Sequence, residues 1–531
     1  MINNFKAKFK ESDLFRVYQS IDLGNLDTQN KALNESVPSL MKLRQYLYSE
    51  ECRHFMEDIA CIERGTLTDK IDCAVNCHDQ GCHLLCHDDV IGTRKISYIL
   101  YLTDPDPEWN DEDGGRLELY DNFEEIVKLK IKDDNDSKQS EIKRKVPGVI
   151  PVKTILPKFN AMAYFEVQPG VSFHSVQEVF CERPRLSIQG WYHANDTPKH
   201  LDEASLNQLK SNHNNEEENE EFIPIQNNIQ AINLRKCDDD NTLTTEDINY
   251  LSKYINETYL KKESIDEIRN QFGEESSVQL RHFLNDEWDT NVKSKVLRVD
   301  EEQNISRGKP PMDYSVGCDK DWKLVGPAHK QRFLEYIGDR SNDNDSCGSV
   351  LSFLKESLFQ SPQFGRLLKS YTSLGPLGYR GKVRRFRPGL DYTVAHYGIL
   401  TKTAVLDATM CFVRGSGKQT LGLNEDDEHD IVWQSDDKGG FECYIAADEE
   451  DEIEKEAADE YDDDDDTKLL SVSASNNTLS LVYRDPGTMR FVKYVGCRAP
   501  SSRWDISLEY ELEDDSEQDE DDKHDIISPN E

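Results

Sequence analysis

A change from helical to strand-like patterning, made twice along the 531-residue chain, is the feature that most constrains the fold. Apolar residues recur at helical spacing between Ser12 and Ile62, and from Leu84 onward β-branched and aromatic runs predict strands. After Asn241 helices are predicted again, and strands return from about Pro376. This order is typical of an antiparallel sandwich or barrel that carries helices on its outside. The sequence therefore predicts an α+β, mainly β fold built from a duplicated domain.

Individual strands are predicted from apolar runs that are bounded by turn residues. These runs are 95–103, 115–120, 161–167 and 185–192 in the first half, and 384–387, 392–396, 404–408, 440–445 and 479–483 in the second. Two helix starts are predicted in the second half, one at Thr244 and one at Ser264, where Ser-Ile-Asp-Glu resembles a capping box. The polar stretch from Thr197 to Asn241 is interpreted as a linker.

Negative charge is concentrated in a few segments, although it dominates the whole chain at a formal net charge of -40. Between Asp448 and Asp466, 14 of 19 residues are acidic, and further acidic runs span Glu511–Asp525 and, more weakly, His213–Glu221. Such runs repel themselves and bury no apolar surface, so these segments are predicted to be disordered. They serve either as solvated loops or as docks for a strongly basic partner, and their charge argues against direct nucleic-acid binding.

The chain carries no feature that points to secretion or to a membrane. Its first residues, from Met1 to Lys6, are polar and lack the apolar core of a signal peptide, and no apolar run approaches the length of a transmembrane helix. The 13 cysteines are therefore expected to be thiols in a reducing compartment, which leaves cytoplasm, nucleus or both.

A candidate metal site begins at Cys86-His87-Asp88-Asp89, beside a predicted strand. Side chains alternate along a strand, so His87 and Asp89 are expected on the same side. One imidazole and one carboxylate, joined by a third ligand from elsewhere, would form the facial triad that oxygen-activating Fe(II) enzymes use. His174, in a short apolar-flanked strand, is the candidate for that third ligand, with a buried core histidine as the alternative reading.

Three further residues are candidates for binding an anionic co-substrate. Arg185 and Ser187 share one face of a predicted strand, where a guanidinium fork and a hydroxyl suit a carboxylate. Tyr101 lies on a predicted strand whose face also carries Ser97, and its hydroxyl would add a hydrogen bond. Taken singly, Arg185 could form an ordinary ion pair and Tyr101 could belong to the core. The order of all these residues along the strands favours a metal and co-substrate site.

A structural zinc site is the main alternative metal reading. Its candidate ligands lie at spacings of three to five residues before the proposed iron site: Cys73, Cys77, His78, Cys82, His83 and Cys86. Thiolates and imidazoles are the ligands that zinc prefers, but the spacing lacks paired C-x-x-C elements. On a strand, half of these side chains would also face away from any shared centre.

The order H-x-D, H and R-x-S resembles that of the double-stranded β-helix 2-oxoglutarate oxygenases. Longer strings resemble the ribosomal-protein prolyl 3-hydroxylases, which carry two such β-helix domains in tandem. These strings are 84–89, 99–102, 114–120, 165–167 and 185–191 in the first half, and 384–386, 439–445, 479–485 and 491–493 in the second. The resemblance covers most of the chain outside the acidic runs. It implies two tandem jelly-roll domains, each with flanking helices.

Carried over residue by residue, the resemblance implies that His87, Asp89 and His174 bind Fe(II) and that Arg185 and Tyr101 bind 2-oxoglutarate, with Ser187 added on the strand reasoning. It further implies O2 as second co-substrate, ascorbate as reductant, and a proline in the decoding-centre protein of the small ribosomal subunit as the site of 3-hydroxylation. That activity would affect translation accuracy or termination. The alternatives are an oxygenase of another protein side chain, or a non-enzymatic scaffold in translation or mRNA regulation with acidic docking segments.

The second half departs from the metal pattern. His396-Tyr-Gly398 lacks a carboxylate, and no histidine lies near Lys493. The expected organisation is a catalytic domain at residues 1–200, a linker at 201–241, a non-catalytic β-helix domain at 242–512 with an acidic insertion at 446–467, and an acidic tail at 513–531.

Overall fold

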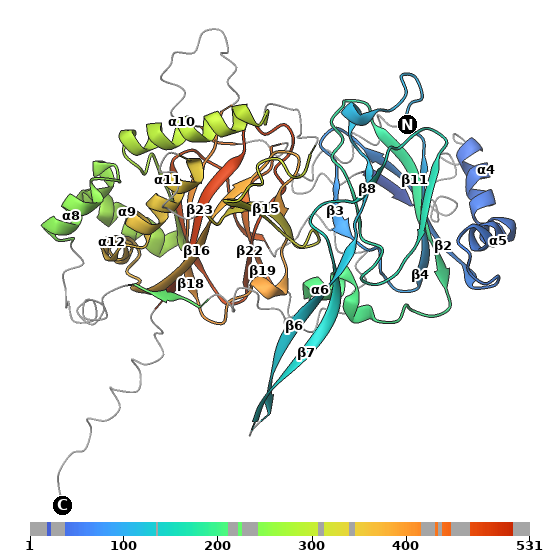
Figure 1. The fold of residues 1–531 in the computed structure, drawn as a ribbon, viewed down its shortest axis with the longest axis horizontal. Helices are drawn as coiled ribbons and strands as arrows, with labels where there is room; N and C mark the ends of the chain where they lie inside the picture. The colour runs from blue at the N-terminus through green and yellow to red at the C-terminus, as the bar shows by residue number, and fades with distance from the viewer. Residues whose placement is uncertain are drawn as a thin grey trace, which may run out of the picture.

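The structure is a computed structural model, and it describes residues 19–22, 38–133, 136–210, 221–225, 243–305, 313–338, 346–415, 431–433, 438–447 and 468–512. The acidic runs at 448–466 and 513–525 lie outside the described residues, as do residues 213–220 of the weaker run, so their predicted disorder stays a prediction. The described part of the chain forms two β bodies that lie side by side (Figure 1).

The first body consists of two antiparallel sheets and a long hairpin. The larger sheet has the order β1-β2-β11-β4-β9 and the smaller one β3-β10-β5-β8, while β6 and β7 form the hairpin that projects from the body (Figure 1). The strands are β1 (Gln19–Asp22), β2 (Leu67–His78), β3 (Leu84–His87), β4 (Arg94–Tyr101), β5 (Leu117–Leu119), β6 (Asn122–Asp133), β7 (Asp136–Pro147), β8 (Lys153–Ile155), β9 (Met162–Glu166), β10 (His174–Val176) and β11 (Arg185–Ala194).

Short helices complete the first body. They are α4 (Pro38–Leu47), α5 (Glu50–Ile59), η1 (Asp111–Asp113), η2 (Leu201–Glu203) and α6 (Ser205–Lys210). Helix α5 begins after Ser49, whose side chain accepts a hydrogen bond from Cys52 N. Glu50 and Glu51 lie in its first turn, where negative charges interact favourably with the helix dipole and stabilise the helix. Both α4 and α5 pack against the larger sheet through buried residues such as Met56 and Tyr192.

The second body repeats this plan with more helices. Its large sheet has the order β13-β21-β18-β23-β16-β15-β14. In addition, β12 pairs with β16 and β17 pairs with β15. Its small sheet has the order β20-β19-β22. The strands are β12 (Ile223–Pro224), β13 (Ser277–Arg281), β14 (Trp322–Val325), β15 (Gln331–Tyr336), β16 (Pro376–Phe386), β17 (Tyr392–Thr393), β18 (Val405–Phe412), β19 (Glu442–Ala446), β20 (Lys468–Val472), β21 (Thr478–Arg484), β22 (Thr488–Val492) and β23 (Arg503–Leu512).

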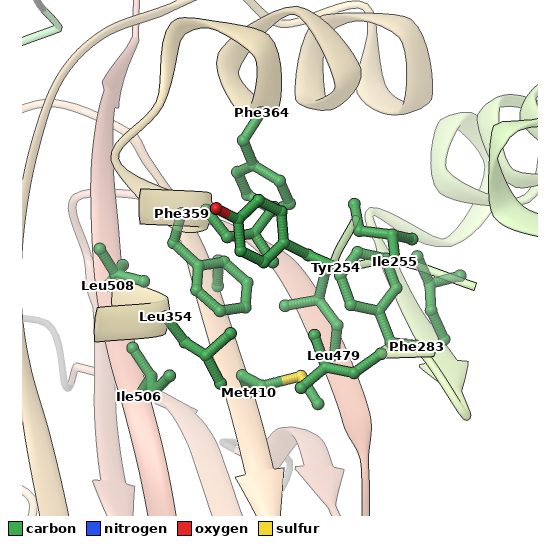
Figure 2. Close-up of a cluster of buried hydrophobic side chains, with 14 of the residues drawn as sticks. Tyr254, Ile255, Phe283, Leu354, Phe359, Phe364, Met410, Leu479, Ile506 and Leu508 are labelled. Carbon is green, nitrogen blue, oxygen red and sulfur yellow. The ribbon is translucent and has the colours of Figure 1, made fainter. Parts of the chain in front are cut away.

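The helices of the second body gather on one face of its large sheet (Figure 1). They are α8 (Thr245–Leu251), η4 (Glu257–Leu260), α9 (Lys262–Glu275), α10 (Asp286–Glu302), α11 (Cys347–Leu354), η5 (Lys355–Phe359) and α12 (Pro362–Thr372). The short helix η6 (Tyr397–Ile399) lies elsewhere, against β22 and α6. The largest apolar core lies between these helices and the sheet, where Phe359 and Phe364 meet Met410 and Leu508 (Figure 2). Because this core uses the outer face of β16, β18 and β23, their opposite face is left to line the interior of the barrel.

The predicted α+β, mainly β architecture with flanking helices is confirmed, with corrections at element level. Within the segment predicted as helical from Ser12, Gln19–Asp22 is a strand that pairs with β2. Part of the predicted linker is folded: α6 belongs to the first body, and β12 pairs with β16. The predicted start at Thr244 is a capping box with Asp247, but Ser264 lies inside α9, which begins at Lys262 without a side-chain cap.

Buried polar contacts join the two bodies. The Arg332 guanidinium of the second body lies 3.4 Å from both the Tyr120 hydroxyl and the carbonyl oxygen of Val149 in the first. Cys497 N–H donates a 2.8 Å hydrogen bond to the Glu178 carboxylate. Such desolvated polar contacts favour one relative placement of the two bodies, since each buried group depends on its partner across the interface.

Candidate active site

Two antiparallel strands of the small sheet bring the proposed iron ligands together. His87 ends β3, His174 begins β10, and the two residues are directly paired, with ring centroids 4.3 Å apart. Asp89 lies between them, with Oδ1 3.3 Å from His87 Nε2 and Oδ2 3.5 Å from His174 Nε2. The three ligand atoms lie within 4.8 Å of one another. Two imidazoles and one carboxylate are the donor set of a facial triad for Fe(II).

Backbone carbonyl groups orient both imidazoles. Nδ1 of His87 lies 2.7 Å from the Leu85 oxygen, and Nδ1 of His174 lies 2.8 Å from the Ser172 oxygen. Since a carbonyl oxygen only accepts, each Nδ1 carries a proton, which leaves each Nε2 as the nitrogen that can bind a metal. Burial, assisted by the charge of His87, lowers the pKa of His174 to about 4, so this ring is neutral near pH 7, as a metal ligand must be.

Asp89 lies in a turn after strand β3, so the alternation of side chains along a strand does not explain its position. Strand β3 ends at His87, and Asp89 adopts a left-handed backbone with φ of 63°. The neighbouring Asp88 is buried and accepts hydrogen bonds from Ser205 N at 2.9 Å and Ser205 Oγ at 2.8 Å, which fixes the turn. The expectation that Asp89 continues a strand was therefore wrong, although its side chain does lie beside His87. Surrounding hydrogen bonds hold this turn in an unfavourable backbone conformation.

The Asp89 carboxylate is held by two further side chains. Ser97 Oγ and Trp191 Nε1 each donate to Oδ2 at 3.0 Å. The Trp191 ring is in turn covered by Arg94, whose guanidinium carbon is 3.6 Å from the ring centroid. Asp88, Trp191 and the role of Ser97 were not predicted. Side chains alternate along β11, so Trp191 lies on the same face as Arg185 and Ser187. Its position facing the site could therefore have been predicted from the sequence.

The proposed co-substrate residues lie side by side on the large sheet. Ser187 on β11 pairs in register with Tyr101 on β4, and Arg185 lies two residues earlier on the same face. All three residues are fully buried. Among the described residues, Nη1 and Nη2 of Arg185 and the hydroxyls of Ser187 and Tyr101 have no hydrogen-bond partner. A buried guanidinium with unfilled donors is costly, so this group of donors fits the distal carboxylate of 2-oxoglutarate.

Two successive glycines lie beside Arg185, and one of them makes room for its side chain. The Gly115 carbonyl accepts a 2.7 Å hydrogen bond from Arg185 Nε, and this orients the guanidinium. Gly115 has φ of +67°, and a Cβ there would lie 2.7 Å from Arg185 Cδ. Gly114, at φ of +71°, would place a Cβ 2.2 Å from the Glu178 carbonyl oxygen. Both positions therefore require glycine, for backbone conformation and for space.

The cysteine-rich segment brings no second set of metal ligands together within the described ranges. Among the described residues, His87, Asp89 and His174 are the one group of three or more potential ligands that comes close enough to share an ion. The structure thus gives no support to zinc bound by the Cys73–Cys86 cluster. None of the twelve cysteines in the described ranges forms a disulfide, in agreement with the expected thiols.

The equivalent region of the second body carries different chemistry. His396 is buried at the start of η6, and Gly398 supplies no carboxylate. Arg490, on β22, lies close to Asp407 and Glu442.

Two family models and several relatives match both halves of the chain. Residues 73–193 match the 2OG-Fe(II) oxygenase superfamily, and residues 246–520 match the family described as oxoglutarate and iron-dependent oxygenase degradation C-term. The prolyl 3,4-dihydroxylase OGFOD1 of Ostreococcus tauri is 37% identical over 516 residues, which cover 95% of this chain and 89% of that protein. The prolyl 3-hydroxylase OGFOD1 of Xenopus laevis is 28% identical over 510 residues, covering 93% and 78%. Among solved structures, a Pseudomonas putida prolyl-4-hydroxylase aligns over 34% of this chain and 71% of that chain, with 19% identity and a TM-score of 0.20.

The fold and the site together define an Fe(II)- and 2-oxoglutarate-dependent dioxygenase. Within that class, the chain belongs to the OGFOD1 family of oxygenases, whose relatives it matches over nearly its whole length. Fe(II), 2-oxoglutarate and O2 are accordingly its cofactor and co-substrates. None of the described helices has both the length and the apolar character needed to cross a membrane.

Proposed function

We propose that this chain is a protein prolyl hydroxylase that acts at C3 of a proline in the decoding-centre protein of the small ribosomal subunit, and thereby affects translation accuracy or termination. The reaction and residue type are those in the names of the relatives, which include prolyl 3-hydroxylases and a prolyl 3,4-dihydroxylase. The ribosomal substrate rests on the resemblance of the strand sequences to the ribosomal-protein prolyl 3-hydroxylases.

The observation that carries the enzymatic part of the proposal is the environment of Arg185. This residue is buried on the sheet that faces the His87–Asp89–His174 group, and no carboxylate of the described ranges pairs with it. Arg185, Ser187 and Tyr101 would hold the distal carboxylate of 2-oxoglutarate, and the triad would hold Fe(II). When bound, Fe(II) with 2-oxoglutarate and O2 supplies the oxidation of a C–H bond, and 2-oxoglutarate is converted to succinate and CO2. The His87 side chain is 34% exposed, so a prolyl residue would approach the site from this side.

The charge of the chain favours a basic protein as substrate. The formal net charge is -40, and ribosomal proteins that contact RNA are commonly basic. Long-range attraction between opposite charges speeds the encounter of two proteins and weakens as salt is added. The acidic segments would thus steer a basic substrate toward the catalytic domain.

Two further parts of the proposal concern the cellular setting. The cysteines of the described ranges are thiols, which suits the reducing environment of the cytoplasm and nucleus, the proposed locations. Ascorbate is the proposed reductant that maintains iron as Fe(II). Imaging of a tagged full-length chain and turnover assays with and without ascorbate test these two points.

Mass spectrometry of small-subunit proteins tests the proposed substrate. Cells that lack this chain would be complemented with the wild-type chain or with His174→Ala. The proposal predicts that wild type alone restores one or more oxygen atoms on a single proline of the decoding-centre protein. Hydroxylation restored equally by His174→Ala would contradict the site, whereas restored hydroxylation of a different protein would contradict only the ribosomal substrate.

A further inference from the structure

Asn76 is a buried polar residue on the sheet that carries the proposed co-substrate residues. It lies in β2, is 0% exposed, and pairs in register with Ser187 of β11. Among the described residues, neither its Nδ2 nor its Oδ1 has a hydrogen-bond partner. Burying an amide without hydrogen bonds is costly, and nearly all such groups in folded proteins have a partner. Asn76 therefore points to a bound molecule.

The alternation of side chains along β2 places Asn76 on the inner face of the large sheet. Cys73 packs with residues of α4 and α5 in an apolar core on the outer face. Asn76 lies an odd number of residues away, so its side chain points to the opposite face. Trp191 shares that face with Ser187, and its indole donates to Asp89. Asn76 is thus on the face that looks toward the proposed iron ligands.

Three polar side chains form one row across this face. Ser187 lies in the middle, paired with Tyr101 of β4 on one side and with Asn76 of β2 on the other. Directly opposite residues on neighbouring antiparallel strands have Cβ atoms about 5 Å apart. Asn76 therefore borders the space in front of Ser187 from the side opposite Tyr101. A carboxylate held by Ser187 and Tyr101 would lie beside the Asn76 carboxamide.

Arg185 lies in the next row, directly opposite His78 of β2. Both residues are fully buried, and burial, together with the charge of Arg185, holds the pKa of His78 well below its ordinary value. The imidazole is therefore neutral near pH 7. Asn76 is the diagonal neighbour of Arg185 on β2, a position within reach of a long side chain. The residues that β2 presents to the guanidinium are thus uncharged.

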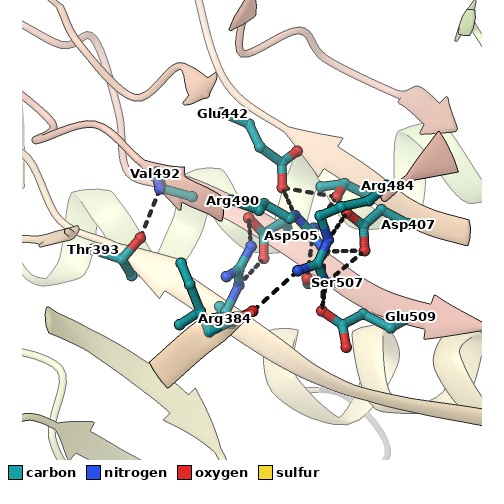
Figure 3. Close-up of polar contacts among 12 residues, drawn as sticks. Arg384, Thr393, Asp407, Glu442, Arg484, Arg490, Val492, Asp505, Ser507 and Glu509 are labelled. Atoms are coloured by element: carbon teal, nitrogen blue, oxygen red, sulfur yellow. Dashed lines mark hydrogen bonds and ion pairs between the residues drawn. The ribbon is translucent and has the colours of Figure 1, made fainter. Parts of the chain in front are cut away.

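The second body shows the opposite arrangement around a buried arginine. Arg484 is 1% exposed, and its Nε donates to the Asp407 carboxylate at 2.8 Å (Figure 3). There the chain itself supplies the carboxylate. Around Arg185, no carboxylate of the described ranges takes that place. A neutral residue at position 76 leaves the Arg185 donors to a ligand, whereas an aspartate there would pair with them.

2-Oxoglutarate offers the acceptors that the Asn76 amide needs. It carries two carboxylates and a keto oxygen, and the amide nitrogen has two hydrogens to donate. The amide oxygen needs a donor instead, which a water molecule that enters with the co-substrate can supply. The carboxamide thus adds a hydrogen bond to an anionic ligand without adding a charge of its own.

We propose that Asn76 is a further co-substrate residue, whose amide nitrogen donates a hydrogen bond to 2-oxoglutarate from the side opposite Tyr101 and whose neutrality leaves Arg185 to that ligand. The residue determines the affinity for 2-oxoglutarate and does not bind iron. The inference does not depend on which side chain is hydroxylated, so it stands apart from the proposed prolyl substrate.

Calorimetric titration with 2-oxoglutarate tests the proposal without turnover, on the full-length chain with Fe(II) under nitrogen. Asn76→Leu keeps a similar shape and removes the amide, and it should weaken 2-oxoglutarate binding by about tenfold. Asn76→Asp adds one negative charge and should weaken binding by about 100-fold or more, through repulsion and through pairing with Arg185. Fe(II) affinity without 2-oxoglutarate should stay that of wild type. Asn270→Asp is the matched control, since this residue is exposed on α9, and it should bind 2-oxoglutarate as wild type.

Thermal melting without iron and 2-oxoglutarate separates a ligand-binding residue from a structural one. Removing a buried amide that lacks partners should leave the Tm of the unloaded chain unchanged or raise it. An asparagine that serves the fold would lower the Tm when replaced. Saturating Fe(II) and 2-oxoglutarate raise the Tm of wild type by mass action, and this rise should be smaller for both Asn76 variants.

The proposal would be overturned if the folded Asn76→Leu and Asn76→Asp chains bound 2-oxoglutarate as tightly as wild type. It would equally be overturned if both variants lowered the Tm of the unloaded chain, because Asn76 would then serve the fold. If Asn76→Leu does not fold, Asn76→Asp, which keeps the size of asparagine, is the deciding variant.

Discussion

The hydroxyl of Tyr314, in the second body, donates a hydrogen bond to the carboxylate of Glu118 in the first. The same carboxylate accepts a 2.7 Å hydrogen bond from Ser175 Oγ, and Ser175 directly follows the proposed iron ligand His174. Glu118 is 2% exposed, so these donors replace the hydrogen bonds that water would otherwise make to its carboxylate. The second body therefore supports the strand that carries the proposed iron ligand His174.

Tyr314→Phe should weaken iron binding. The substitution leaves a buried carboxylate without one donor, which costs about 1–3 kcal/mol and loosens β10. Because Tyr314 acts through two intervening residues, Fe(II) affinity should fall by about three- to tenfold, less than for a direct partner of a ligand. Tyr371→Phe is the matched control, since its hydroxyl bonds Tyr259 O within the second body. Equal Fe(II) affinity in both variants would show that the interface does not act on the site.

Arg185→Lys should raise the KM for 2-oxoglutarate by about 10- to 100-fold, because lysine keeps the charge but loses the planar fork that binds a carboxylate bidentately. Fe(II) affinity, measured without 2-oxoglutarate, should hardly change. Steady-state assays and anaerobic iron titration together separate the two effects. Lost iron with unchanged 2-oxoglutarate binding would reassign Arg185 to a structural role.

Gly115→Ala should impair co-substrate binding more than it impairs stability. The added Cβ meets Arg185 Cδ at 2.7 Å and displaces the guanidinium, while the φ of +67° adds about 1 kcal/mol of strain. Gly92→Ala is the control for strain alone, because Gly92 has φ of +53° and its added Cβ would meet no atom of the described residues within 4 Å. Backbone strain should lower the Tm of both variants by a similar amount. Only Gly115→Ala should show a raised KM for 2-oxoglutarate. A similar KM in both would remove the proposed role of Gly115.

Glu178→Gln should reduce the pH dependence of stability. Burial raises the pKa of Glu178 to about 7 from an ordinary value of 4.5. A raised folded pKa gives stability that is fully present below about pH 4.5 and is lost as pH rises through 7, by up to about 3 kcal/mol. Glutamine is neutral at every pH and still accepts from Cys497 N. The Tm of both chains should therefore be measured at pH 5.5 and pH 8.5. Between these values the Tm of the wild-type chain should fall more than that of the variant. An equal change in Tm for both chains would refute the effect.

The residues that the large sheet contributes to the site could be predicted, because side chains alternate regularly between the two faces of its strands. Strand β11 places Arg185 and Ser187 on one buried face as expected. Asp89 shows where the same rule fails, since the chain leaves β3 after His87 and turns through a left-handed residue. Nothing in the local sequence reports that turn, because the bonds that hold it come from Ser205, far along the chain.

The duplicated, mainly β fold was predictable from patterning, but contacts between the halves were not. The folded residues 201–210 are polar like a linker, and it is their hydrogen bonds to Asp88 that bind them to the first body. The hydrogen bond from Tyr314 to Glu118 joins residues far apart in the sequence, and only the three-dimensional structure brings them together.

Iron content per chain tests the central claim most directly. The full-length wild-type chain and His174→Ala would be loaded with Fe(II) under nitrogen, desalted and analysed for iron, with circular dichroism as the check on folding. The facial triad of His87, Asp89 and His174 predicts one iron per wild-type chain and none in the folded His174→Ala chain. A folded variant that retains the wild-type iron content would contradict the assignment of the site.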